Sequence, residues 1–173
     1  MNHKPVSNQT LAQLMSLTDT IAEAESPKQI YTSVADAAKS CIDYKLLTIM
    51  AFDAESMRVK RIYSSNPGAY PLGGDKGKRD TPWGRQVLIE GRPFISATEE
   101  DIRENFDDHN FIFELGLKSV MNIPVRIYGR TKGTLNFLND VSVYDAQDLE
   151  WGLFLAAQLI GPVSIENNPD NIY

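Results

Sequence analysis

Two asparagines, Asn122 and Asn136, stand inside runs of residues that otherwise favour β-strands. Asparagine is a poor strand former, and its amide must be hydrogen-bonded once it is buried. A pair of amides offers donors and acceptors together, which is the chemistry needed to bind a polar organic molecule. The alternative is that the two amides satisfy each other, or the backbone of a nearby loop, with no ligand involved.

The two asparagines belong to a predicted hairpin over residues 118–139. A three-residue loop over Tyr128 to Arg130 sets Asn122 directly opposite Asn136, whereas a two-residue loop sets Asn122 against Leu135 and mixes polar with apolar positions. We therefore expect the three-residue loop, with the polar face forming the wall of a cavity. Strand alternation puts Val120, Asn122, Pro124 and Arg126 on that cavity face, and Met121, Ile123, Val125 and Ile127 on an apolar face suited to helices.

Further candidate ligand contacts lie between residues 63 and 111, in a stretch expected to roof the cavity. Aromatic side chains are common walls of small-ligand pockets, although core packing explains them equally well. The basic run Lys76, Lys78, Arg79 and Arg85 suits an anion, although such runs are usually solvated. His109 beside Asp107 suits a ligand contact, although exposure is the simpler interpretation. The expected ligand-binding residues are Asn122, Asn136, Tyr63, Tyr70, Trp83, Arg85, Phe94, Asp107 and His109, with no catalytic residue and no metal ligand.

Hydrophobic periodicity and helix-start signals predict the elements that carry these residues. Three- and four-residue spacing predicts an amphipathic helix over 10–24, and Ser26 with Pro27 and Gln29 is a capping signature for a second helix ending near residue 43. Glycine and proline make the segment 66–80 too irregular for a regular element. The other predicted elements are strands over 46–52, 57–64 and 93–95, a short helix over 82–91, a helical region over 99–115 and a closing helix over 145–161.

Composition narrows the class of protein. A chain of 173 residues suits one domain with a full core, and 42% hydrophobic with 23% charged residues argues against wholesale disorder. A formal charge of -6 opposes binding to nucleic acid or to anionic membranes. The single cysteine, Cys41, excludes an intrachain disulfide. Because no apolar run has membrane-spanning length and no secretory signal is present, a cytoplasmic location is expected.

The order of elements and the hairpin motif resemble the GAF domain family of small-molecule sensors. The matching motifs are L-G-x-x-S-h-h-x-h-P-h over Leu115–Val125 and x-G-R-x-x-G-x-L-x-h over Tyr128–Phe137, where h is a hydrophobic residue. The resemblance covers roughly residues 10–162. It implies an α+β fold, similar to GAF and PAS domains, with a central antiparallel sheet of five or six strands. The N- and C-terminal helices would cover one face, and loops and short helices would roof a ligand cavity on the other. The expected domain is 10–162, between a flexible N-terminus over 1–9 and a flexible C-terminal tail over 163–173.

The resemblance implies a stand-alone sensory or regulatory module that binds a small polar organic metabolite between the sheet and the 63–111 roof. One alternative is an enzyme that acts on a carbonyl or amide compound, and another is a dimerisation module with a vestigial pocket. Cysteine-based methionine sulfoxide reductases share this fold, but Cys41 lies on the second helix without a partner, so that activity is not expected. No cofactor is expected. The expected partners are the small-molecule ligand, a second copy of the chain through its N- and C-terminal helices, and a separate output protein.

Overall fold

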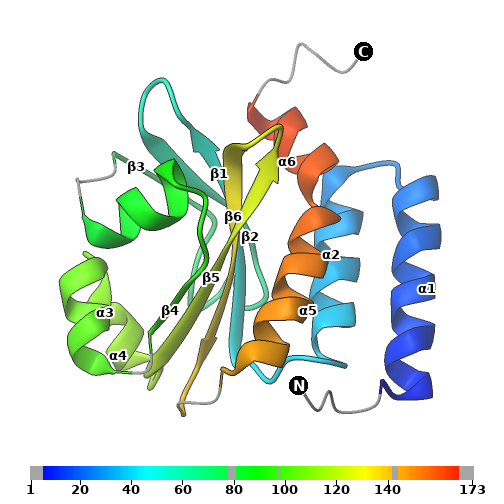
Figure 1. The fold of residues 1–173 in the computed structure, drawn as a ribbon, viewed down its shortest axis with the longest axis horizontal. Helices are drawn as coiled ribbons and strands as arrows, with labels where there is room; N and C mark the ends of the chain where they lie inside the picture. Colours follow the sequence, from blue (N-terminus) through cyan, green and yellow to red (C-terminus); the bar gives the residue numbers. More distant parts are fainter. Residues whose placement is uncertain (1–5, 78–80, 97, 142–143, 168–173) are drawn as a thin grey trace.

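The computed structural model describes residues 6–77, 81–96, 98–141 and 144–167, which form a six-stranded antiparallel sheet with helices on both faces (Figure 1). The strand order is β3-β2-β1-β6-β5-β4, so the two long hairpin strands lie beside β1 at the centre of the sheet. The expected α+β fold is confirmed. The strands are β1 (Leu46–Asp53), β2 (Arg58–Ser64), β3 (Gly73–Gly77), β4 (Phe94–Ser96), β5 (Ser119–Ile127) and β6 (Arg130–Asn139).

The helices divide into two layers by their position along the chain. The helices from the two ends of the chain form the terminal layer on one face of the sheet, with α1 packed on α2. The helices from the middle of the chain form the roof on the opposite face (Figure 1). The terminal layer consists of α1 (Asn8–Glu23), α2 (Pro27–Ala38), α5 (Ala146–Ala157) and α6 (Ile160–Asn167), and the roof contains the π-helix η1 (Gly84–Ile89), α3 (Glu99–Asn105) and α4 (His109–Glu114).

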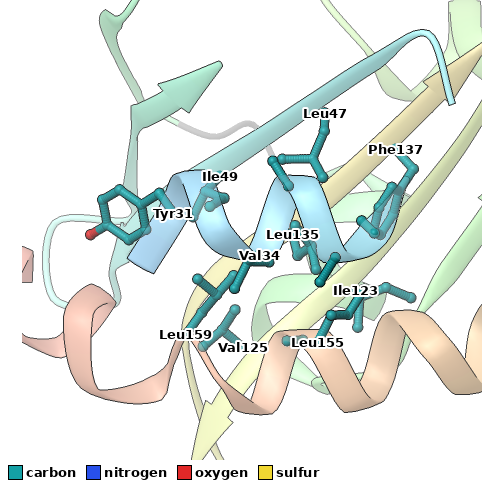
Figure 2. Close-up of a cluster of buried hydrophobic side chains, with 14 of the residues drawn as sticks. Tyr31, Val34, Leu47, Ile49, Ile123, Val125, Leu135, Phe137, Leu155 and Leu159 are labelled. Carbon is teal, nitrogen blue, oxygen red and sulfur yellow. The ribbon is translucent and has the colours of Figure 1, made fainter. Parts of the chain in front are cut away.

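The larger hydrophobic core lies between the sheet and the terminal helices. Figure 2 shows Val34 of α2 and Leu155 of α5 beside apolar side chains of the sheet, and both are fully buried. Helix α2 begins at Pro27 as its capping signature predicts, with the Gln29 side chain accepting from the backbone N–H of Ser26. The apolar hairpin face is also confirmed where it reaches this core. Its residues there are Met121, Ile123 and Val125 of β5, facing Leu135 and Phe137 of β6.

The central hairpin reaches its expected register by an unexpected route. Asn122 pairs with Asn136 as predicted, but the predicted three-residue loop is wrong. The strands are joined by a two-residue turn, Tyr128-Gly129, in which both residues have positive φ, 49° and 78°. This is the geometry of a type I′ turn, whose twist matches that of the flanking strands. The one-residue difference is taken up at Lys132, where a bulge shifts the pairing before it reaches the asparagines.

One added strand and the limits of the first and last helices differ from their sequence predictions. The segment 66–80 contains an edge strand, β3, because pairing to β2 uses backbone groups and needs no particular side-chain pattern. Helix α1 begins at Asn8, capped by Ser7. The closing helix predicted over 145–161 is divided into α5 and α6, and α6 extends past the expected domain end at residue 162. Pro162 lies in the first turn of α6, where a missing N–H has no cost. Residues 1–5 and 168–173, parts of the predicted flexible ends, lie outside the described residues.

Gly133 tests how closely the second hairpin strand must approach its neighbours. A methyl group added there would overlap the carbonyl oxygen of Met50 and would lie 2.8 Å from a methyl carbon of Val163. We expect Gly133→Ala to lower the free energy of unfolding by at least about 2 kcal/mol, because a backbone oxygen in a sheet cannot turn aside. Urea denaturation followed by circular dichroism measures the change.

Gly161→Ala is the matched control, because no atom within 4 Å would meet the added methyl group. This variant should be neutral, or more stable by up to about 1 kcal/mol, since alanine is the better helix former. Equal stability of the two variants would contradict the close approach at Gly133.

Candidate functional site

A directed chain of hydrogen bonds crosses the roof-facing side of the sheet. The indole Nε1 of Trp83 donates to Asn122 Oδ1 at 2.9 Å, and Asn122 Nδ2 donates to Asn136 Oδ1 at 2.6 Å. Asn136 Nδ2 then donates to the hydroxyl of Thr48 at 3.1 Å. Thr48, Asn136 and Asn122 are paired neighbours on three adjacent strands, and each side chain is buried. Sheet register therefore aligns the side chains of Thr48, Asn136 and Asn122. Together with Trp83 they form the amide row.

Trp83 fixes the orientation of both amides. An indole N–H can only donate, so the Asn122 amide must turn its oxygen toward Trp83 and its nitrogen toward Asn136. Asn136 must in turn present its oxygen to Asn122, which leaves its own nitrogen for Thr48. The alternative that the two amides satisfy each other is thus correct in part. Each amide nitrogen nevertheless carries a second N–H, which makes no hydrogen bond to the described residues.

The amide row forms part of the lining of a cavity of about 50 Å³ between the sheet and the roof. Such a volume holds a few water molecules or a small chemical group. Pockets for drug-sized ligands typically measure roughly 300–1,000 Å³, so a larger ligand requires the roof to move outward. The apolar part of the lining consists of Met50, Val59, Phe106, Ile112, Val120 and Leu138.

A cluster around Arg61 of β2 joins the sheet to the roof. The Arg61 guanidinium carbon lies 3.8 Å from the centre of the Tyr70 ring, and Arg61 Nη1 donates to the carbonyl oxygen of Pro71 at 2.7 Å. The Tyr70 hydroxyl donates to Asp108 Oδ2 at 2.6 Å. Burial, and then the negative charge of Asp108, raise the pKa of Tyr70, so the phenol stays protonated as this donor. The cluster thereby connects β2, the following loop and the residue before α4.

Five of the nine predicted site residues line the cavity: Asn122, Asn136, Tyr70, Trp83 and Asp107. Asp107 is exposed, whereas the other four are buried. Tyr70 also stacks on Phe111 of α4, with ring centres 5.5 Å apart. Their placement at the cavity follows the prediction, and contact with a ligand stays a prediction for each.

Tyr63 was expected at the cavity, and this placement is wrong. Its ring centre lies 6.2 Å from that of Tyr31, and it packs against the core under the terminal helices. Alternation would keep Tyr63 on the same face as Arg61, but β2 contains an extra residue, Ile62, in its pairing with β1. This bulge reverses the facing of the residues that follow it.

Three other predicted site residues lie near the cavity but not among its lining residues. Arg85 is exposed on η1. Phe94 packs on Phe106, a lining residue, with ring centres 6.1 Å apart. His109 Nδ1 donates to the carbonyl oxygen of Phe106 at 2.8 Å, and its ring lies beside Phe113. The basic run beside Arg85 includes Lys78 and Arg79, which lie outside the described residues.

Sequence reasoning missed three polar residues of the lining: Thr48, Arg61 and Asp108. Arg61 had a signal, because it shares a strand face with the apolar residue Val59. Thr48 had none, since threonine is an ordinary strand residue and its neighbour Asn136 lies 88 residues further along the chain. Asp108 had no signal either, because its hydrogen-bond partner Tyr70 is 38 residues away in sequence.

Cys41 lies beyond the end of α2, against the core on the opposite face of the sheet from the cavity. Its thiol is 3.5 Å from the carbonyl oxygen of Ala38. Burial, together with the negative charge of Asp148, raises the pKa of Cys41 to about 11. The thiol is therefore protonated at neutral pH and remote from any ligand in the cavity, which does not favour cysteine-based chemistry there.

Comparison with known proteins finds a family match and similar folds. The family described as "GAF domain" matches residues 24–160. The GAF domain of a phosphoenolpyruvate-protein phosphotransferase from Acinetobacter is 18% identical with a TM-score of 0.72, and the alignment covers 96% of this chain and 99% of that one. The GAF domain of a two-component sensor histidine kinase from Bacillus halodurans is 21% identical with a TM-score of 0.66, covering 83% and 96%.

An enzyme is among the similar structures. Free methionine-R-sulfoxide reductase from Neisseria meningitidis, solved in complex with its substrate, is 14% identical with a TM-score of 0.63, and the alignment covers 98% of each chain. At such identities these likenesses show the fold alone. No curated protein matches the sequence. Within the described part of the chain, every helix is too short or too polar to cross a membrane.

The amide row should contribute strongly to stability. Asn122→Ala leaves the Trp83 indole N–H and Asn136 Oδ1 without their partner in a buried site. At about 1–3 kcal/mol for each unsatisfied buried group, we expect the free energy of unfolding to fall by roughly 2–5 kcal/mol. Chemical denaturation of the wild type and the variant gives this difference.

Asn110→Ala serves as the control, because Asn110 is an exposed asparagine of α4. It should change the free energy of unfolding by less than about 0.5 kcal/mol. If Asn122→Ala is equally mild, the amide row does not hold the sheet and roof together as described.

Proposed function

Because the chain belongs to the GAF domain family, we propose that it is a sensory or regulatory module that binds a small polar organic metabolite between its sheet and its roof. The observation that carries this proposal is the buried row from Trp83 to Thr48, which forms part of the cavity wall. Buried amides in a central sheet cost stability unless they are fully paired. Their remaining donors are best explained by a polar ligand.

The rest of the lining supports the same proposal. Small-molecule sites are mostly apolar, with a few precisely placed polar groups that orient the ligand. This cavity follows that pattern, since six apolar side chains surround the amide row and the Arg61 cluster. The polar groups come from the sheet on one side and from the loop before β3 and the start of α4 on the other.

Ligand binding would be coupled to movement of the roof. The cavity of about 50 Å³ is too small for a metabolite of ten or more atoms. Tyr70 and Asp108 belong to the roof and are linked to Arg61 of the sheet, so an expanding cavity would displace this cluster. A ligand that favours the expanded arrangement shifts the population toward it. A separate output protein would then recognise the altered roof.

The alternative function, an enzyme acting on a carbonyl or amide compound, has less support. Its candidate residues were Asp107, His109 and the two asparagines, and of these His109 does not line the cavity, while its Nδ1 donates to the Phe106 carbonyl oxygen. Cys41 lies on the other face of the sheet. Chemical analysis of any bound compound after incubation distinguishes the two functions, because the sensor returns its ligand unchanged.

A thermal-shift screen of polar metabolites tests the sensor function. A ligand present at about 100 times its Kd adds about 2.7 kcal/mol of stability and raises the melting temperature by several degrees. Ile112→Phe enlarges a buried side chain of the cavity lining. We expect this variant to lose most of the ligand-induced shift, measured against its own melting temperature without ligand.

The same exchange at an exposed residue, Ile95→Phe on β4, is the matched control and should retain the full shift. If the two variants respond equally to every hit, the ligand binds elsewhere and the proposed site is wrong. If no metabolite stabilises the wild type, the interpretation as a dimerisation module with a vestigial pocket is favoured.

We also propose that the chain forms a homodimer through its terminal helices. Leu11 and Met15 lie one turn apart on α1 and are 53% and 63% exposed. Leu153 and Phe154 of α5 are about half exposed as well. Exposed apolar side chains gathered on one helical layer suit a self-complementary interface between two copies related by a two-fold axis.

Met15→Glu should weaken this dimer by roughly tenfold or more, because the interface would bury an unpaired charge. Sedimentation equilibrium or light scattering with gel filtration measures the effect. Leu72→Glu places the same charge on a residue of similar exposure outside the terminal helices and should leave the mass unchanged. A wild-type protein that remains monomeric at high concentration would refute the dimer.

A further inference from the structure

One nitrogen of Arg61 is buried without a hydrogen-bond acceptor. Among the described residues, three buried side-chain atoms lack any partner: Arg61 Nε, Thr134 Oγ1 and the Tyr144 hydroxyl oxygen. Of these three residues, Arg61 alone lines the cavity. A buried donor of a charged group is costly to leave unpaired, so the Nε–H requires an explanation at this site.

The polar groups beside Arg61 on the sheet also have hydrogen-bond donors to offer. Within the described part of the chain, Asn122 and Asn136 each use one N–H and keep a second, while their oxygens already accept from Trp83 and from Asn122 respectively. The Thr48 oxygen accepts from Asn136, which leaves the hydroxyl hydrogen free to donate. Counted over the described residues, the sheet side of the cavity therefore offers four unused donors. A ligand that fits it must supply acceptor atoms.

We propose that the ligand carries a carboxylate group and that Arg61 binds this group through its Nε–H. This inference rests on the proposed function, because it assigns the ligand class for the same cavity. The guanidinium is charged at every physiological pH and matches a planar carboxylate through the edge formed by Nε and Nη2. The apolar lining would hold the hydrocarbon part of the ligand.

Asp108 leaves this edge of Arg61 available. Arg61 Nη2 is 3.9 Å from Asp108 Oδ2, which is beyond hydrogen-bond length, and that oxygen instead accepts from Tyr70. Among the described lining residues, Arg61 carries the one positive side-chain charge. A monocarboxylate supplies the single negative charge that matches it.

Three small probes of similar shape test the charge preference on the wild-type protein. Propionate, propionamide and propylammonium are titrated separately into ¹⁵N-labelled protein at millimolar concentrations. We expect propionate to shift the Arg61 Nε–Hε resonance together with the side-chain amide resonances of Asn122 and Asn136. Its affinity should exceed that of propionamide by roughly tenfold, as expected for a hydrogen bond between charged groups.

Two arginine substitutions on the same strand test the role of Arg61. Arg61→Gln keeps polar hydrogens but removes the charge, and it should weaken propionate binding by roughly tenfold or more. Arg58→Gln removes a charge from an exposed position of β2 and should leave the affinity unchanged. If Arg61→Gln binds propionate as tightly as Arg58→Gln does, the assignment of Arg61 is overturned.

The outcomes separate this inference from the proposed function. If propionamide or propylammonium binds as tightly as propionate, the carboxylate class is wrong, while binding of a small polar molecule in the cavity stands. If none of the probes shifts the three side chains, the carboxylate inference is overturned. The thermal-shift comparison of Ile112→Phe with Ile95→Phe then decides the proposed function independently, because that screen includes neutral and cationic metabolites.

Discussion

The requirement that buried amides be hydrogen-bonded governs the arrangement of sheet and roof. Asn122 and Asn136 are 97% buried, and each has an oxygen and a nitrogen that need partners. The pairing of β5 with β6 brings them together, and β1 supplies the Thr48 hydroxyl on one side. The roof supplies the Trp83 indole on the other. A shift of one residue in the hairpin would set Asn122 opposite Leu135, so that the two amides would face opposite sides of the sheet and lose their bond to each other.

The bulges explain how one sheet serves two different surfaces. The face toward α2 and α5 is almost wholly apolar (Figure 2), and the opposite face carries the polar row. At Lys132 a bulge restores the register that the short type I′ turn would otherwise shift. At Ile62 another bulge sends Tyr63 to the helices while Arg61 stays at the cavity. Each bulge changes which side chains face the roof without interrupting the sheet.

The roof combines two kinds of attachment to the sheet, and they differ in strength. The hydrogen bond from the Trp83 indole to Asn122 of β5 is buried. The link from Arg61 to Tyr70 and Asp108 is partly hydrated, with the Arg61 side chain 12% exposed and that of Asp108 25% exposed. Interactions reached by water contribute less to stability than buried ones. The loop around Tyr70 and the start of α4 are therefore the part of the roof that can move away from the sheet at the lowest cost.

The sequence by itself determined the fold family and the two faces of the hairpin, because alternation and paired motifs are local properties of the chain. The opposition of Asn122 to Asn136 was predicted from a three-residue loop that the hairpin does not have, and the bulge at Lys132 produces that pairing instead. Tertiary structure decided which roof residues reach the cavity. Trp83 is 39 residues from Asn122, and Arg61 meets Asp108 across the sheet and roof, so no local pattern relates them. Tyr63 was misplaced for a related reason: a bulge depends on how two strands pair, and period-two alternation cannot show it.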